Sequence, residues 1–167
     1  QADQTHSGTV AALGDVNILA SGTNAQGQAS SIHASSSAIW AAGLQPNGQL
    51  TGQQNLHVQA SGQVQTAGKA LATQNLTVQG ASLDLSQSSQ QASTVQLQAI
   101  TGDLKATGSQ ILATEQLQMQ TPQTLVTGGA RVQAPTVSLQ AASISNVAGQ
   151  IIQTGTSNQT IALQGSL

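Results

Sequence analysis

Two acidic residues, Asp84 and Asp103, are spaced so that they could act together in catalysis. They have the same separation along the chain as the neighbouring Leu85 and Leu104. If the chain repeats with this period, the two carboxylates occupy equivalent positions on neighbouring coils, about 5 Å apart. That separation would suit the carboxylate pair of a retaining glycosidase. The simpler interpretation is two solvated side chains on an outer face, with Lys105 nearby as partial compensation.

Parallel β-helices include polysaccharide lyases and glycosidases, so a carbohydrate-active enzyme or a glycan-binding surface is one interpretation of this pair. The chain has no Phe or Tyr to stack against a sugar ring, and its single Trp, Trp40, is far from both acids in the sequence. A hard cation would need more oxygen ligands than two carboxylates supply. We therefore predict no enzyme activity and no catalytic residue, and keep the carbohydrate-active solenoid as the alternative.

The histidines and the basic residues do not form a recognisable site. His33 and His57 each lie between aliphatic residues at positions predicted to face outward, and His6 is isolated near the start. A zinc site needs three or four converging ligands, and the chain has no Cys. Nucleic-acid binding requires a basic stripe, whereas the basic residues are only Lys69, Lys105 and Arg131. We expect no metal, no cofactor and no nucleic-acid partner. We also expect no membrane span, because no apolar run approaches about 18 residues.

The overall composition is far from that of a compact globular domain. Charged residues make up 5% of the chain and aromatic residues 1%, whereas an ordinary domain contains about 25% charged residues. Without aromatic side chains a compact core loses much of its usual buried area. Disorder and a Gln-rich prion-like tract are also disfavoured, because the net charge is only −2 and Leu, Val and Ile are regularly spaced.

A short phrase of alternating aliphatic and polar residues recurs along the chain. Asn-Leu-His-Val-Gln-Ala at residues 55–60 returns as Asn-Leu-Thr-Val-Gln-Gly at residues 75–80. Further copies begin at Thr94, Gln116, Thr136 and Thr160, and an earlier copy begins at Asp15. From Leu56 onward the leading aliphatic residues recur at similar intervals, of which the last, between Val137 and Ile161, is the longest. This period predicts a solenoid with about 20 residues per coil.

The pattern within each repeat indicates strands and not helices. Aliphatic and polar residues alternate, which is the period of a β-strand. In the unit after residue 55 we expect strands at 56–58, 64–66 and 70–72, with bends at Gly62 and Gly68. The unit from residue 95 repeats this plan with bends at Gly102 and Gly108. We therefore predict an all-β fold, a right-handed parallel β-helix with three short strands per coil.

Stacked coils would place equivalent aliphatic residues in columns inside the solenoid. One predicted column contains Leu56, Leu76, Val95, Leu117, Val137 and Ile161. The next predicted column contains Val58, Val78, Leu97, Met119, Leu139 and Leu163. Outward positions hold Gln, Ser, Thr and Asn, whose side chains can form hydrogen-bonded ladders from coil to coil.

The chain divides into two sections, residues 1–54 and residues 55–167. The repeat is regular in the second section, whereas the phrase is lost over residues 20–54, where Pro46-Asn47-Gly48 predicts a tight turn. We interpret residues 1–54 as irregular coils that carry an excursion from the rod, with a capping element as the alternative. Trp40 lies in this section and is a candidate contact residue for a receptor or another filament. Both ends of the sequence stop in mid-coil, so we expect further coils of the same long chain as neighbours.

The regular section resembles the haemagglutinin repeat. The similar residues are 137–146 (Val-Ser-Leu-Gln-Ala-Ala-Ser-Ile-Ser-Asn) and 149–155 (Gly-Gln-Ile-Ile-Gln-Thr-Gly), together with residues 75–86 and 102–109. This repeat is typical of filamentous haemagglutinin-like exoproteins, which include adhesins and the effectors of contact-dependent growth inhibition. The resemblance covers about residues 55–167 and leaves residues 20–54 unmatched.

The resemblance implies a right-handed β-helical filament that a partner transporter secretes across the outer membrane, as in two-partner secretion. Such a rod projects from the bacterial cell surface and presents a receptor-binding region, with a toxin at the far C-terminus. Rods of this family carry no catalytic residues, so none is transferred to this chain. We therefore expect a structural rod segment of a large secreted surface filament. Its partners would be the transporter and a receptor on a host or target cell.

Overall fold

The computed structural model describes residues 63–65 and 69–164, together with the strands of the N-terminal part. Those strands are β1 (Gln4–Thr5), β2 (Thr9–Ala12), β3 (Val16–Ile18), β4 (Ala25–Gln26), β5 (Ser31–Ala34), β6 (Ala38–Trp40), β7 (Gln49–Gly52) and β8 (Asn55–Gln59). Side chains are described at residues 55–58, 63–65 and 69–164.

The C-terminal part consists of short strands and bends. Its strands are β9 (Val64–Gln65), β10 (Lys69–Ala72), β11 (Asn75–Gly80), β12 (Leu83–Asp84), β13 (Ser89–Ala99), β14 (Leu104–Lys105), β15 (Gln110–Gln120), β16 (Thr124–Val126), β17 (Arg131–Ala134), β18 (Thr136–Ala141), β19 (Ser143–Ser145), β20 (Gln150–Gln153) and β21 (Thr160–Leu163). No helix occurs among the described residues. The prediction of an all-β fold is confirmed.

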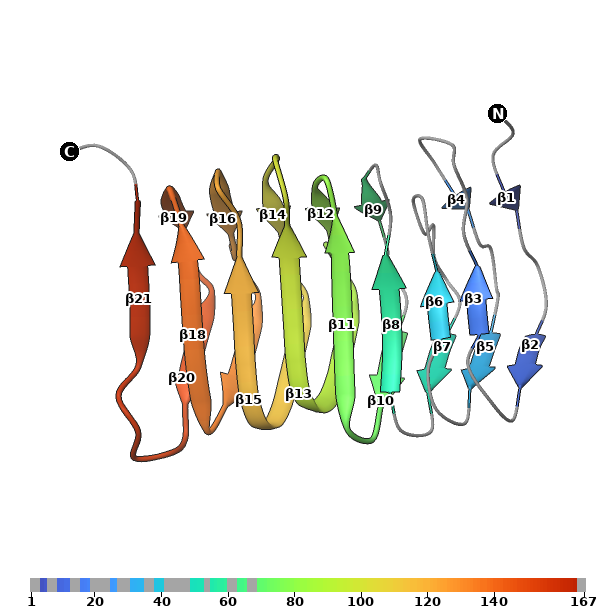
Figure 1. Ribbon diagram of the computed structural model, residues 1–167. Coiled ribbons are helices and arrows are strands. Elements are labelled where there is room, and N and C mark those ends of the chain that lie inside the picture. Colours follow the sequence, from blue (N-terminus) through green and yellow to red (C-terminus); the bar gives the residue numbers. More distant parts are fainter. Residues whose placement is uncertain are drawn as a thin grey trace.

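The strands stack into a parallel solenoid with three walls, and its coil is right-handed (Figure 1). The first wall contains β8, β11, residues 94–99 of β13, residues 116–120 of β15, β18 and β21. The second wall contains β9, β12, β14, β16 and β19. The third wall contains β10, residues 89–92 of β13, residues 110–113 of β15, β17 and β20. Each strand pairs in parallel with its counterpart in the next coil, as predicted.

Parallel pairing also extends into the N-terminal section. β2, β5 and β7 pair in sequence and lead into β10, which places them in the third wall. β3 pairs with β6, and β1 pairs with β4. Residues 41–48, which include the predicted turn at Pro46-Asn47-Gly48, lie outside the described residues. The division at residue 54 and the excursion from the rod therefore stay predictions.

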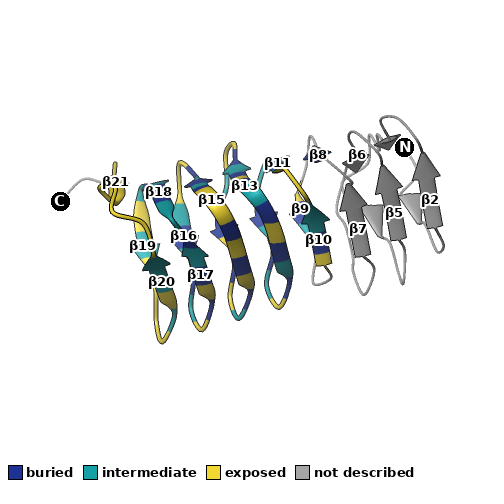
Figure 2. Cartoon of the chain, turned by 90° about the horizontal axis from the view of Figure 1, so that it is seen from below, coloured by how far each residue is buried: buried dark blue, intermediate teal, exposed yellow. Residues whose placement is uncertain are grey.

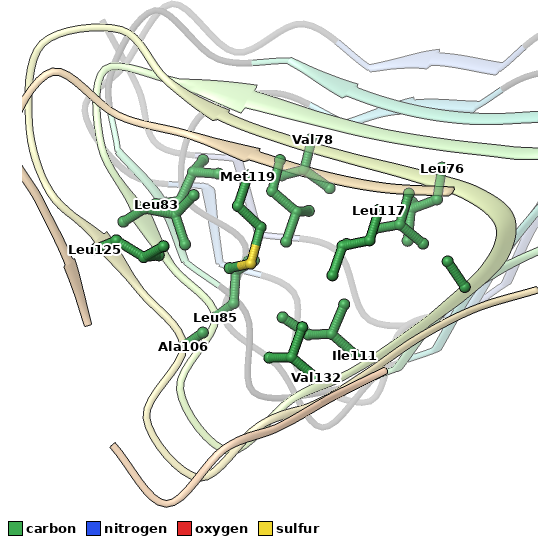
Figure 3. Packing of buried hydrophobic residues seen from close by; sticks show 14 of the residues in the cluster. Leu76, Val78, Leu83, Leu85, Ala106, Ile111, Leu117, Met119, Leu125 and Val132 are labelled. Carbon is green, nitrogen blue, oxygen red and sulfur yellow. The ribbon is translucent and has the colours of Figure 1, made fainter. Parts of the chain in front are cut away.

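The two predicted aliphatic columns lie inside the first wall. Leu56, Leu76, Val95, Leu117 and Val137 are in register and at most 1% exposed. Beside them Val58, Val78, Leu97, Met119 and Leu139 form the second column. Figure 3 shows members of both columns packed against side chains of the other two walls. Burial of such side chains stabilises the solenoid by roughly 2 kcal/mol each.

The last member of each predicted column is wrong. Ile161 pairs with Leu139 and not with Val137, and Leu163 pairs with Ala141. The coil at this point is therefore shorter, by two residues, than the sequence phrase suggested. A strand has a side-chain period of two, so a slip of two residues keeps the same side chains inward. The alternation alone therefore could not distinguish the two registers.

The third wall contains one polar residue in an otherwise aliphatic column. Its inward column is Ala70, Gln90, Ile111, Val132 and Ile151. Gln90 is fully buried, and its Nε2 donates a hydrogen bond to Oγ of Ser88 over 2.9 Å. Its Oε1 has no hydrogen-bond partner. Because an unpaired buried carbonyl costs about 1–3 kcal/mol, Gln90 offsets part of the stabilisation that the neighbouring aliphatic residues provide.

The bends between the second and third walls form a column of stacked turns. In the turns 85–88, 106–109 and 127–130, the N–H of the last residue donates to the carbonyl of the first. The third residue of each turn has a positive φ, and the column comprises Gln87 (60°), Gly108 (64°), Gly129 (65°) and Ala148 (57°). The predicted bend at Gly108 is confirmed, and glycine tolerates this backbone region without strain. The predicted bends at Gly62 and Gly68 lie outside the described residues.

The bend at Gly102 uses glycine for a different reason. A Cβ at this position would lie 2.9 Å from the Cβ of Ser82 on the preceding coil. The backbones of the two coils therefore approach too closely for a side chain at residue 102. The prediction of a bend at Gly102 is confirmed.

Candidate functional site

The two aspartates that suggested a carboxylate pair do not occupy equivalent positions. Leu83 pairs with Leu104, so Asp84 lies opposite Lys105 and not opposite Asp103. The step from β12 to β14 is longer, by two residues, than the step from β11 to β13. The expectation that the two aspartates occupy equivalent positions is therefore wrong, and the residue basis for the alternative of a retaining glycosidase site is lost with it.

A longer bend causes this shift. Residues 81–82 connect the first wall to the second in one coil, and residues 100–103 do so in the next. The N–H groups of Ile100 and Thr101 donate to the carbonyls of Gly80 and Ala81, over 2.9 and 3.0 Å. The spacing of Leu85 and Leu104 could not reveal the longer bend. Leu83 and Leu85 are both buried, so either could have been the partner of Leu104.

Each aspartate instead accepts a hydrogen bond from the backbone. Oδ1 of Asp84 accepts from the N–H of Ser86 over 3.2 Å, which is a local turn contact. Oδ1 of Asp103 accepts from the N–H of Thr124 on the following coil over 3.1 Å. Each of these contacts ties a bend to the backbone of the same or the next coil. Lys105 is exposed and lies in register with Asp84 on the next coil.

The structure brings no histidine to a metal site within the described residues. His57 is partly buried on the outward side of β8, in register with Thr77. No group of three or more His, Cys, Asp or Glu that could hold a metal ion occurs in the part of the chain that the structure describes. The side chains of His33 and Trp40 lie outside the described residues, as does His6 altogether. The contact role of Trp40 therefore stays a prediction.

The outward side of the first wall is the most regular surface of the described residues. We call it the glutamine face, and it comprises Asn75, Thr77, Gln79, Thr94, Gln96, Gln98, Gln116, Gln118, Gln120, Thr136, Ser138 and Gln140. All of these side chains are exposed or partly exposed, whereas the residues between them are buried. None carries a charge.

One column of this face consists of a single residue type. Gln79, Gln98, Gln120 and Gln140 are in register from coil to coil, and we call them the glutamine ladder. By backbone register Gln59 continues the column on β8. Nε2 of Gln79 donates to Oε1 of Gln98 over 3.2 Å, so an amide contact connects successive coils. A similar contact joins Asn75 and Asn55, over 2.8 Å.

The expectation that outward polar residues form ladders between coils is confirmed at several positions. Oγ1 of Thr114 donates to Oγ of Ser93 at a bend, and Thr124 and Ser143 share a hydrogen bond across the second wall. The sequence did not single out the glutamine ladder itself. The sequence feature that could have revealed the ladder is the recurrence of Gln at the same place in successive copies of the phrase.

The charged residues of the described part lie outside the glutamine face, although Glu115 directly precedes Gln116 at its edge. Lys69 and Arg131 belong to the third wall, and Asp84 and Lys105 to the second. Asp103 is the last residue of the longer bend and directly precedes β14. Glu115 is exposed where β15 passes from the third wall to the first. The residues of the glutamine face therefore carry no formal charge, whereas the second and third walls each contain charged residues.

The chain is similar to a segment of toxin CdiA from Yersinia pestis. The two sequences are 33% identical over 140 residues, which cover 84% of this chain and 4% of CdiA. The chain therefore spans only a small part of the length of this relative. No protein-family model and no solved structure matches the chain. In the described part of the chain, no helix has the length and apolar character of a membrane span. The similarity and the β-solenoid together fit a protein of the CdiA or haemagglutinin-like type.

Proposed function

We propose that this segment is a structural rod within a large secreted filament of the bacterial cell surface, and that it projects binding or toxin modules from the cell. The similarity to a segment of toxin CdiA supports the connection to contact-dependent growth inhibition. The parent filament would be an adhesin or an effector of this kind. A partner transporter in the outer membrane would secrete it, and a receptor on a host or target cell would bind it.

The observation that carries the proposal is the uniform coil-to-coil register. From β8 to β18 each strand of the first wall has the same two inward aliphatic positions, and each coil buries those of the next. The stability of such an array is approximately the sum of similar contacts between neighbouring coils. Coils can therefore be added or removed, and their number sets the length of the rod. We assign this segment no enzyme activity, because Asp84 and Asp103 accept hydrogen bonds from backbone N–H groups at bends.

Each coil of the rod depends on its neighbours to bury its inward side chains. Ile161 and Leu163 of β21 are 51% and 60% exposed, although their partners on β18 are fully buried. We assign residues 1–54, with Trp40, the role of irregular coils and a local contact site, and residues 55–167 that of regular haemagglutinin-type repeats.

Deletion of one complete coil in the parent exoprotein tests the rod proposal. Removing residues 94–115 joins Ser93 to Gln116, which is the register partner of Thr94 and takes its place in the first wall. The remaining coils should close in register, and the rod should shorten by about 4.8 Å. We expect unchanged secretion, an unchanged β-type circular dichroism spectrum of the purified segment, and unchanged inhibition of target cells.

A half-coil deletion is the matched control. Removing residues 94–104 would bring the turn at residues 106–109 into the first wall, and we expect misfolding. The proposal would be contradicted if the complete-coil deletion were secreted and folded normally but abolished inhibition. That result would mean that residues 94–115 bind or react with something specific.

A further inference from the structure

The glutamine face is a flat polar surface that nothing in the rod proposal uses. In Figure 1 the strands that carry it, β11, β13, β15 and β18, lie side by side at the front. A rod needs the inward side of these strands for its core, and their outward side needs only to be soluble. The same amide nevertheless recurs at one position on four successive coils. This regularity is more than solubility requires.

The neutrality of the face restricts the class of partner. Charged ligands such as nucleic acids, acidic glycans and anionic lipids need a charged surface, and this face has none. A second copy of the same face, in contrast, brings no like charges together. The third wall would place Lys69 and Arg131 against their own copies if it docked in this way. The glutamine face is therefore better suited than the third wall to contact the same surface of a second copy.

The spacing of the face points to the same partner. Successive glutamines of the ladder are separated by one strand spacing of about 4.8 Å along the rod. A second solenoid presents amides at the same spacing, so each glutamine of one copy meets an amide of the other. A primary amide both donates and accepts hydrogen bonds. Stacked sheets with such ladders pack face to face in polar zippers about 10 Å apart.

We propose that the glutamine face is a lateral docking surface for a second copy of this solenoid, so that two rods lie side by side with their glutamine ladders facing each other. The four strands of the face cover about 300 Å² per copy, from their spacing and length. Two copies would bury roughly 600 Å², which is below the roughly 1,200 Å² or more of a stable complex. This segment alone therefore associates weakly, and longer rods associate more strongly because each further coil adds area.

Single-cysteine variants of the whole chain test the proposal, because the natural sequence has no Cys. Gln98→Cys places a thiol in the ladder. Gln91→Cys places one on the same strand, β13, but on the exposed side of the third wall. A short bifunctional maleimide that spans about 10 Å should link two Gln98→Cys chains at high protein concentration. The Gln91→Cys control should stay monomeric in a denaturing gel.

A charge variant provides the second measurement. Gln98→Lys places a cation in the ladder of both copies, and like charges that face each other weaken association at least tenfold. Sedimentation of the chain at high concentration should therefore show less dimer for Gln98→Lys than for the unchanged chain or for Gln91→Lys. Circular dichroism of each variant establishes that the fold is kept.

Equal cross-linking of the two cysteine variants would overturn the proposal. So would sedimentation of the unchanged chain as a monomer at millimolar concentration. The coil deletion does not affect this test, because it measures the length of the rod and not its contacts. The coil deletion can therefore contradict the rod function while the cross-linking supports lateral docking. The opposite pair of results can also be observed.

Discussion

The inner coils and the last coil have the same kind of sequence but very different burial. β18 reads Thr-Val-Ser-Leu and β21 reads Thr-Ile-Ala-Leu, and both alternate polar or small residues with large aliphatic ones. Val137 and Leu139 of β18 are fully buried, whereas Ile161 and Leu163 of β21 are more than half exposed. Figure 2 shows this change from buried and partly buried strands to a wholly exposed one.

The difference shows that burial in this solenoid is a property of the stack and not of the single strand. A strand buries its inward side chains only when a coil lies on each side of it. In such arrays stability is approximately a sum of contacts between nearest neighbours. Equivalent substitutions should therefore have large effects in the inner coils and small effects in the last coil.

The largest expected difference in stability is between substitutions of Leu139 and Ile161, which are register partners on β18 and β21. Leu139→Ala in β18 should lower the free energy of unfolding by about 2–5 kcal/mol, because it leaves a cavity among closely packed side chains. Ile161→Ala in β21 should lower it by less than about 1 kcal/mol, because that side chain is already half exposed. Urea denaturation of the two variants and of the unchanged chain measures both values. Equal losses would show that the last coil is as well packed as the inner coils.

The aliphatic columns could be predicted from the sequence because two periods reinforce each other. The strand period of two decides which residues face inward, and the coil period decides which of them stack. Leu56, Leu76, Val95, Leu117 and Val137 satisfy both periods, and the structure places them in one column.

The errors arose where bends differ in length. A difference of two residues in the length of a coil keeps the inward pattern, so it displaced the expected partners of Asp103, Ile161 and Leu163 without disturbing the alternation. Gln90 could not be predicted to face inward either, because a glutamine is usually outside. Its buried position depends on its register with Ala70 and Ile111.

The stacked turns allow a second comparison between inner and outer coils, for which the expected changes in stability are smaller. Gly129 has a positive φ of 65° and open space around the position of its missing Cβ, apart from ordinary contacts with Gly108. Gly129→Ala should therefore lower the free energy of unfolding by about 1–2 kcal/mol, which is the cost of a left-handed conformation for a residue with a Cβ. Thermal and urea denaturation measure this loss. An unchanged stability would indicate that the turn adopts another conformation in solution.

Ala148 occupies the next position in this column of turns and gives the reverse test. Its φ is 57°, and the N–H of Gly129 donates to the carbonyl of the preceding Val147. Ala148→Gly should relieve strain and stabilise the chain, but by no more than about 0.5–1 kcal/mol, because glycine also gains freedom in the unfolded state.

The gain in the free energy of global unfolding should be smaller still if the last coil opens before the rest of the rod. Local opening then releases the strain at Ala148 without global unfolding. Hydrogen exchange separates the two cases: the gain should appear in the protection of β19 and β20 even where the global transition does not move. A loss of protection there would contradict a strained Ala148. The stacked turns would then be held by contacts between coils and not by the backbone preference of each residue.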